Sequence, residues 1–114
     1  MKDCLFCRIE RKEIPSKLVF EDDLAIAFED ISPQAPTHIL VIPRKHIPST
    51  NEISPEDTPL LGHLLTEAGR IARERNVAKE GYRLVINCGP AAGQAVHHLH
   101  IHILGGRQMH WPPG

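Results

Sequence analysis

The segment His98–Leu104 carries the side chains with the clearest chemical potential in the chain. From His98 onward, histidine alternates with an apolar residue, which is the period-2 pattern of a half-buried strand. One face of such a strand would carry His98, His100 and His102 at intervals of about 6.5–7 Å. Imidazole serves as a proton shuttle, nucleophile or metal ligand near neutral pH, whereas a solvated strand face more ordinarily carries Lys, Glu and Thr. The pattern therefore predicts a functional site.

The loop before this strand, residues 88–94, has the composition of an anion-binding turn. Gly89, Gly93 and the small side chains of Ala91 and Ala92 leave backbone N–H groups accessible to a ligand. Gln94 adds amide donors. A phosphate held by this loop beside imidazoles predicts phosphoryl or nucleotidyl transfer; the alternative is an ordinary hairpin connection.

The cysteines form a second feature of interest. Their count is three, and two of them make the pair Cys4-x-x-Cys7. In a reducing compartment such a pair indicates metal ligands or a redox motif before it indicates a disulfide.

The elements that must position these residues follow from periodicity and from capping signals. We expect a short helix within 4–12, strands at 17–21, 24–29, 38–43, 82–87 and 98–104, and a long helix from Ser54 to about Asn76. This order predicts an α+β antiparallel sheet with the helices on one face.

Length and composition limit the classes of function. A chain of 114 residues supports one domain, and its 41% apolar and 24% charged residues are typical of a globular protein. The net charge of −1 gives no basic surface for nucleic acid. No apolar run reaches the roughly 18 residues of a membrane span, and Met1-Lys2-Asp3 leads into no signal-peptide core. We expect a cytoplasmic protein without nucleic-acid or membrane partners.

The histidine segment fits His-φ-His-φ-His-φ-φ, where φ is apolar, and on this motif the chain resembles the histidine triad (HIT) superfamily. Ile14-Pro15, residues 30–38, Gly93-Gln94 and residues 105–114 are similar to its Hint branch, the histidine triad nucleotide-binding proteins. The likeness spans almost the whole chain. It implies a single HIT domain over residues 1–114. The implied fold has a five-stranded antiparallel sheet per protomer with one short and one long helix, and the sheets join across a homodimer.

The resemblance also implies an activity, the hydrolysis of purine nucleoside phosphoramidates without a cofactor for catalysis. By this match His100 is the nucleophile that forms a nucleotidyl-histidine intermediate, and His102 contacts the phosphate and helps the leaving group. His98 and His38 form the relay that fixes the tautomer of His100. The partners implied are a purine nucleoside monophosphate or phosphoramidate and a second copy of the chain.

The same match assigns the nucleotide pocket. It places Asp30 on the ribose, Phe6, Ile9, Phe28 and Ile31 around the base, and Asn87, Gly93, Gln94, Ala95, His100 and His102 around the phosphate and leaving group. Trp111, in the tail 105–114, is implied to reach the partner's active site. The chain departs from the branch at Ala95, where a serine is usual, which predicts weaker assistance to the leaving group. It also departs at His97, which replaces an aromatic residue and is expected to pack on the apolar side.

Some bacterial HIT proteins carry a structural zinc on residues that match Cys4, Cys7, His46 and His98. Two thiolates and two imidazoles suit tetrahedral zinc; the alternative is two buried cysteines acting as small apolar residues, with His46 exposed. Three other functions stay open: a zinc hydrolase with His98, His100 and His102 as ligands, a dinucleoside polyphosphate hydrolase, and a nucleotide-binding regulatory protein.

Overall fold

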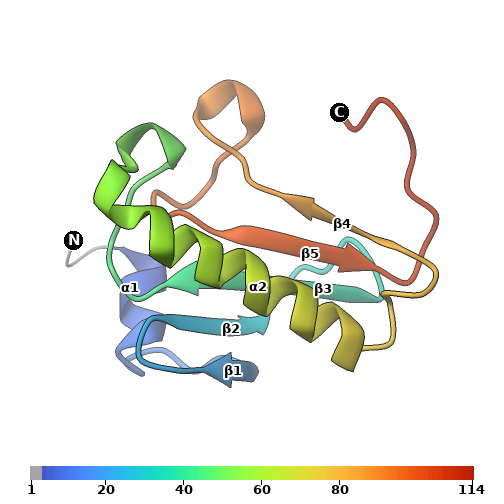
Figure 1. The fold of residues 1–114 in the computed structure, drawn as a ribbon, viewed down its shortest axis with the longest axis horizontal. Coiled ribbons are helices and arrows are strands. Elements are labelled where there is room, and N and C mark those ends of the chain that lie inside the picture. The colour runs from blue at the N-terminus through green and yellow to red at the C-terminus, as the bar shows by residue number, and fades with distance from the viewer. Residues whose placement is uncertain (1–3) are drawn as a thin grey trace.

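The structure, a computed structural model, describes residues 4–114, so Met1-Lys2-Asp3 lies outside the described residues. Five antiparallel strands form one sheet in the order β1-β2-β3-β5-β4 (Figure 1). The strands are β1 (Leu18–Glu21), β2 (Ala25–Glu29), β3 (Thr37–Pro43), β4 (Tyr82–Val85) and β5 (Ile101–Gly105), and the helices are α1 (Leu5–Glu10) and α2 (Thr58–Glu74). The predicted α+β class with five antiparallel strands and one short and one long helix is confirmed.

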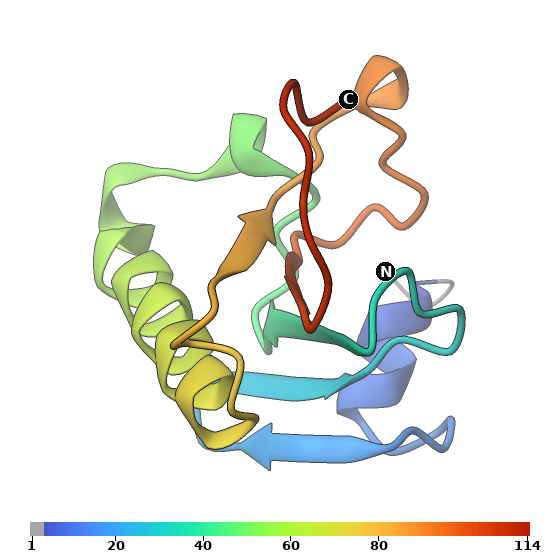
Figure 2. The same ribbon diagram turned by 90° about the vertical axis from the view of Figure 1, so that its right-hand side faces the viewer.

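The two helices cover opposite faces of the sheet, as Figure 2 shows. The central strands β2 and β3 are buried along nearly their whole length, so both of their faces are apolar. On one face Ala27 and Val41 pack with α2 residues such as Ile71, and on the other Phe28 and Leu40 pack with Phe6 and Ile9 of α1. The prediction that both helices lie on one face was therefore wrong, because a strand apolar on both sides needs cover on both.

The start of α2 differs from the prediction by one turn. Ser54 and Asp57 form a capping box, with the Ser54 N–H donating to Asp57 Oδ2 at 3.0 Å. The turn Pro55–Asp57 is a 3₁₀ turn, and the α-helix begins only at Thr58. Pro59 has no N–H to donate to the carbonyl of Pro55, so α-helical bonding cannot extend back through this turn.

The register of β3 against β5 places the histidines. Leu40 pairs with His102, so His38, two residues away on β3, is a diagonal neighbour of His102 on the same face. The ladder ends where Val41 pairs with Ile101. The predicted strand over 98–104 is thus a ladder only over Ile101–Gly105, and residues 98–100 precede it.

Gly105 ends β5 at a point with no room for a side chain. A Cβ at this position would lie 2.8 Å from Val77 Cβ, and Val77 is buried. We expect Gly105→Ala to lower the free energy of unfolding by about 1–3 kcal/mol through overpacking, measured by urea denaturation. The added Val77→Ala should recover part of this loss. The matched control Gly62→Ala, in an exposed part of α2 with nothing within 4 Å of the new Cβ, should be stabilising by up to about 1 kcal/mol.

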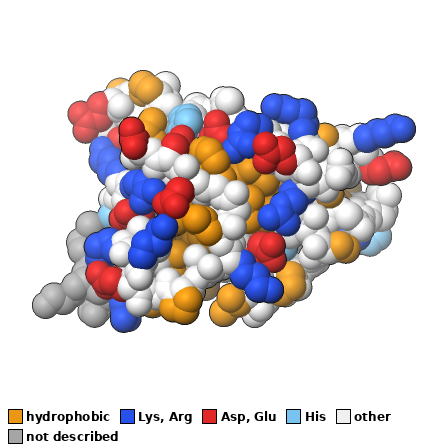
Figure 3. All heavy atoms as spheres, turned by 90° about the horizontal axis from the view of Figure 1, so that it is seen from below, with side chains coloured by type: hydrophobic (Ala, Val, Ile, Leu, Met, Phe, Trp, Pro, Cys, Tyr) orange, Lys and Arg blue, Asp and Glu red, His pale blue; other side chains and the backbone are white. Residues whose placement is uncertain are grey.

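Charged side chains of both signs are interspersed over the face of the molecule shown in Figure 3. No helix within residues 4–114 is long and apolar enough to cross a membrane.

Candidate active site

His100 is held by a backbone carbonyl on one side and an aromatic ring on another. Its Nδ1 lies 2.7 Å from the carbonyl oxygen of His98, and the ring of Phe6 meets it edge-on at 5.0 Å between centroids. Because a carbonyl only accepts, the proton of the neutral imidazole must sit on Nδ1. The lone pair is therefore on Nε2, and burial lowers the pKa of His100, which favours this neutral form.

His38 and His102 form a second chain of oriented groups. The Gln34 N–H donates to His38 Nδ1 at 2.9 Å, so the proton of neutral His38 must be on Nε2. That Nε2–H donates to His102 Nδ1 at 2.9 Å. His102 in turn carries its proton on Nε2, which is buried and has no hydrogen-bond partner among the described residues. The chain thus ends in one unsatisfied N–H donor, and such a buried donor needs an acceptor.

The two histidines of the motif therefore have complementary roles. His100 offers a lone pair at Nε2, and His102 offers an N–H at Nε2, with their ring centroids 4.9 Å apart. A lone pair beside a donor suits attack on a centre that carries negatively charged oxygens, such as phosphorus. In the structure, the hydrogen bond to the His98 carbonyl sets the tautomer of His100. The imidazoles of His98 and His38, which the sequence assigned to this role, make other contacts.

Asp30, His38 and His102 lie close enough together to be considered as metal ligands, with 3.4 Å between Asp30 Oδ2 and His38 Nε2. Their hydrogen bonds argue against an ion there. A metal would need the lone pair of His38 Nε2, but the Gln34 N–H already requires the other nitrogen to be the acceptor. We interpret His38 and His102 as a hydrogen-bond relay, with the Asp30 carboxylate beside it.

Cys4, Cys7, His46 and His98, here called the Cys/His cluster, do fit a metal ion. Their ligand atoms all lie within 4.8 Å of one another. The separations are 3.1 Å for Cys7 Sγ to His46 Nδ1, 3.2 Å between the Nδ1 atoms of His46 and His98, and 3.4 Å from His98 Nδ1 to each sulfur. These are close to the roughly 3.3–3.8 Å that separates ligands in tetrahedral zinc sites.

The hydrogen bonds and charges of the Cys/His cluster agree with this fit. His98 Nε2–H donates to the Pro43 carbonyl at 2.8 Å, which leaves the Nδ1 lone pair directed at the cluster. Burial, together with Cys4, raises the pKa of Cys7 to about 11, so a thiolate there needs the charge of an ion. All three cysteines are free of disulfides. Because the His98 ring faces this cluster, His98, His100 and His102 do not converge on one ion, and the zinc-hydrolase alternative lacks its ligand set.

The loop before the histidines is braced by Gln94. Its side-chain Nε2 donates to the carbonyls of Pro48 at 2.7 Å and Val96 at 3.1 Å, and its Oε1 accepts from the Gly89 N–H at 2.9 Å. Both side-chain donors of Gln94 are thus used within the protein, and its contact with a phosphate stays a prediction. No hydrogen bond from the Ala95 N–H to another residue within 4–114 is found, so this amide is available to a ligand.

The predicted nucleoside residues lie in two environments. Phe6, Ile9 and Phe28 are buried in one apolar cluster, whereas Ile31 is 97% exposed. Asp30 is half-buried and uses Oδ1 to accept from the Ser32 N–H at 2.7 Å. Asn87, predicted to lie near the phosphate, is half-buried. Trp111, predicted to reach the partner's active site, is 82% exposed, and its ring centroid lies 6.0 Å from the Arg83 guanidinium.

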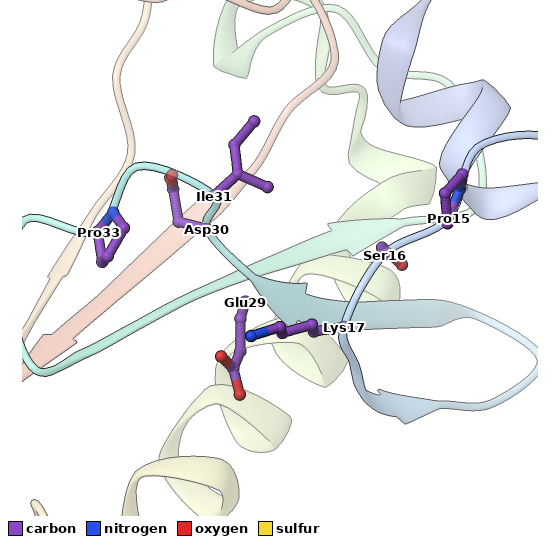
Figure 4. Close-up of a pocket in the computed structure, with 7 residues that line it drawn as sticks. All are labelled: Pro15, Ser16, Lys17, Glu29, Asp30, Ile31 and Pro33. Atoms are coloured by element: carbon purple, nitrogen blue, oxygen red, sulfur yellow. The ribbon is translucent and has the colours of Figure 1, made fainter.

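A pocket of about 530 Å³ adjoins this region, between the segment before β1 and the loop after β2. Asp30 and Ile31 point to one side of it, whereas Lys17 and Glu29 lie on the other, near the end of α2 (Figure 4). Its lining shares Asp30 and Ile31 with the predicted nucleoside site and includes none of the histidines.

Sequence reasoning missed the Gln34 amide and the Pro43 carbonyl, which orient His38 and His98. Every residue has such backbone groups, so residue type carries no signal for them. His97 is exposed, and the expectation that it packs on the apolar side was wrong, because it lies before the ladder where strand alternation does not apply.

The buried histidines make stability depend on pH. Burial, together with the neighbouring His100 and His38, lowers the pKa of His102 to about 4. As pH falls below 6.5, the unfolded chain binds a proton that the folded chain does not. Between pH 7 and 5 this group should therefore lower the free energy of unfolding by about 2 kcal/mol. Urea denaturation at the two pH values tests this. The pH dependence should shrink in His102→Gln, and an unchanged dependence would contradict the prediction.

The comparisons with known proteins agree with this geometry. The HIT domain model matches residues 11–109. A purine nucleoside phosphoramidase of Escherichia coli is 49% identical over 108 residues, covering 95% of this chain and 91% of its own. An uncharacterized HIT-like protein of Synechococcus elongatus is 55% identical over 113 residues, covering 99% and 98%.

Solved structures show the same fold. The crystal structure of a HIT family hydrolase from Legionella pneumophila superposes with a TM-score of 0.97 at 51% identity, covering 98% of this chain and 100% of the other. A HIT family hydrolase from Clostridium thermocellum gives a TM-score of 0.94 at 44% identity, with 96% of each chain covered. The matched domain, the relatives and the shared fold together establish that this chain belongs to the HIT-domain family.

Proposed function

We propose that this protein hydrolyses purine nucleoside phosphoramidates through a nucleotidyl intermediate on His100. The observation that carries this proposal is the set of hydrogen-bond partners that assigns two tautomers, with a lone pair on His100 Nε2 beside an N–H on His102 Nε2. The phosphoramidase from E. coli, at 49% identity, supports the choice of substrate class.

The chemistry follows from these two nitrogens. His100 Nε2 attacks the α-phosphorus, an N–P bond forms, and the P–N bond of the substrate breaks as the amine leaves with a proton from water. His102 Nε2–H donates a hydrogen bond to the phosphate oxygen or to the leaving nitrogen as charge develops. Water then attacks the same phosphorus, the bond to His100 breaks, the nucleoside monophosphate departs, and the proton of the attacking water returns to solvent.

The other pocket residues take supporting roles in this proposal. Asp30 Oδ2 accepts the ribose hydroxyls, and Ile31, which is almost fully exposed, covers the base. Phe6, Ile9 and Phe28 form the floor of the base site. The free amide of Ala95, with Gly93 and Asn87, contacts the phosphate and leaving group, and Gln94 acts by holding this loop in place.

We also propose a homodimer that forms through β4. This strand has a neighbour on one side only among the described strands, and Ile86, which follows it, is exposed. An unpaired strand edge flanked by apolar surface favours pairing with a second copy. The exposed Trp111 of the tail lies beside Arg83, which belongs to β4. From β4 the tail would extend to the active site of the partner subunit.

The Cys/His cluster is proposed to hold a structural Zn²⁺, with Cys4, Cys7, His46 and His98 as ligands. Bound there, the ion would join α1 to the segments that carry His46 and His98. It would supply no group to the phosphorus, so turnover needs no catalytic metal.

The direct experiment compares turnover of an adenosine phosphoramidate and of a diadenosine polyphosphate by the purified protein. We expect the phosphoramidate to be hydrolysed with the larger kcat/KM. A larger value for the polyphosphate would replace this proposal by the dinucleoside polyphosphate hydrolase. Stoichiometric nucleotide binding without turnover of either would favour a regulatory nucleotide-binding protein.

A further inference from the structure

We propose that the Cys/His cluster, when it holds a divalent ion, positions His100 for attack, so that metal occupancy sets the rate of nucleotidyl transfer. This inference rests on the proposed role of His100 as nucleophile. It gives the Cys/His cluster a function beyond stabilising the fold.

The first connection runs through His98, a residue shared by both sites. Its ring is fully buried and is held at both nitrogens, by the cluster at Nδ1 and by the Pro43 carbonyl at 2.8 Å from Nε2. Its own carbonyl oxygen accepts the Nδ1–H of His100 at 2.7 Å. A ring fixed at both nitrogens restricts the peptide to which it is attached. An ion at Nδ1 therefore fixes the carbonyl that sets the tautomer of His100.

The second connection runs through α1. Cys4 and Cys7 flank Phe6, whose ring contacts His100 at 5.0 Å and 89° and Phe28 at 5.5 Å. Helix α1 has six residues, and isolated helices shorter than about 12 residues are marginal in water. Its position thus depends on its anchors. The cluster is one anchor at its first turn, beside the packing of Phe6 against Phe28, and Cys4 also accepts from the Cys7 N–H there.

The two connections reach His100 from different sides. His98 holds its Nδ1, and Phe6 packs against the ring. Loss of the ion would loosen both contacts together and let the His100 ring turn or change tautomer. A ring whose proton sits on Nε2 has no lone pair there for phosphorus.

The group of Asp30, His38 and His102 does not offer a competing route for a metal effect. The Gln34 N–H fixes the proton of His38 on the atom that an ion would need. An effect of metal on turnover is therefore expected to arise at the Cys/His cluster.

The test uses the whole protein in a Zn²⁺-loaded form, a metal-free form made with a chelator and a reductant, and a form to which Zn²⁺ is returned. ¹⁵N NMR of the ring nitrogens of His100 reports its tautomer, and single-turnover kinetics with an adenosine phosphoramidate report the chemical step. We expect one Nδ1–H tautomer in the loaded form and a mixture in the metal-free form. The single-turnover rate should fall about 10–100-fold without the ion and return with Zn²⁺.

Cysteine variants supply the matched controls. The double variant Cys4→Ser, Cys7→Ser should show the metal-free tautomer mixture and slow rate at every Zn²⁺ concentration. Cys88→Ser removes the third cysteine, which lies outside the cluster, and should still bind one Zn²⁺ and show the same His100 tautomer response to Zn²⁺ as the wild type. If the double variant does not fold by circular dichroism, the reversible removal of zinc from the wild type carries the test.

Two results would overturn the inference: absence of one bound Zn²⁺ per chain, or identical His100 spectra and rates in the loaded and metal-free forms. No turnover in either form, with His100 spectra that still follow Zn²⁺, would instead overturn the proposed activity and leave the coupling intact.

Discussion

Replacing His100 with alanine is expected to lower turnover of an adenosine phosphoramidate by at least about 10⁴-fold, because no other imidazole among the described residues presents a free lone pair beside the His102 donor. His98 also has one nitrogen on a carbonyl, but its lone pair faces the Cys/His cluster. In the described chain the nearest candidate, His102, carries its proton on the buried Nε2. The measurement is a single-turnover rate combined with mass spectrometry of acid-quenched protein. The wild type should gain the mass of a nucleotidyl group, and the variant should not.

The matched control is His97→Ala, which removes an exposed imidazole three residues away and should leave both the rate and the adduct unchanged. An adduct that persists in His100→Ala would place the nucleophile elsewhere. A variant that keeps full turnover without any adduct would point to direct attack by water.

The part of the site that could be predicted from sequence is the part fixed by strand geometry. Alternation placed His100 and His102 on the face opposite Ile101 and Ile103, as observed, because neighbouring side chains on an extended chain point to opposite sides. His98 fits the same alternation, yet its ring turns toward the cysteines because the β3–β5 ladder ends before it. The histidine motif predicts the spacing of the side chains along the strand. It does not predict the residue at which the β3–β5 pairing ends.

The Cys/His cluster shows a different limit of prediction from sequence. The spacing of Cys4 and Cys7 indicates two ligands on one helical turn, and local sequence suffices for that. His46 and His98 are joined to them only by the fold, so they entered the prediction through the family resemblance. The structure brings all four together within 4.8 Å, which supports a metal site.

Tautomers could not be predicted, since backbone groups decide them. The Gln34 amide, the Pro43 carbonyl and the His98 carbonyl assign the protons of three histidines, and no side-chain type marks these positions. Gln94 shows a related limit: its residue type indicates amide donors, but not the carbonyls of Pro48 and Val96 to which they donate.

The hydrogen bond from His38 to His102 predicts the second large effect on turnover, which we expect when His38 is replaced. In His38→Leu, His102 Nδ1 loses the N–H donor that now lies 2.9 Å away. The proton of His102 is then free to move to Nδ1, and its Nε2 no longer donates to the reacting phosphate. Loss of one donor of this kind costs roughly 10²-fold in kcat. We expect that decrease with little change in KM, measured by steady-state kinetics, together with a ¹⁵N spectrum in which His102 shows both tautomers.

His38→Gln separates this relay from simple packing, because the side-chain amide of glutamine can place an N–H near the position of His38 Nε2. If donation to His102 is what matters, the glutamine variant should regain much of the lost kcat and a single His102 tautomer. If His38 acts only by filling space beside β5, leucine and glutamine should behave alike. Equal losses in the two variants, with one unchanged His102 tautomer in both, would remove His38 from the relay. The proton on His102 Nε2 would then have to be held by the substrate alone.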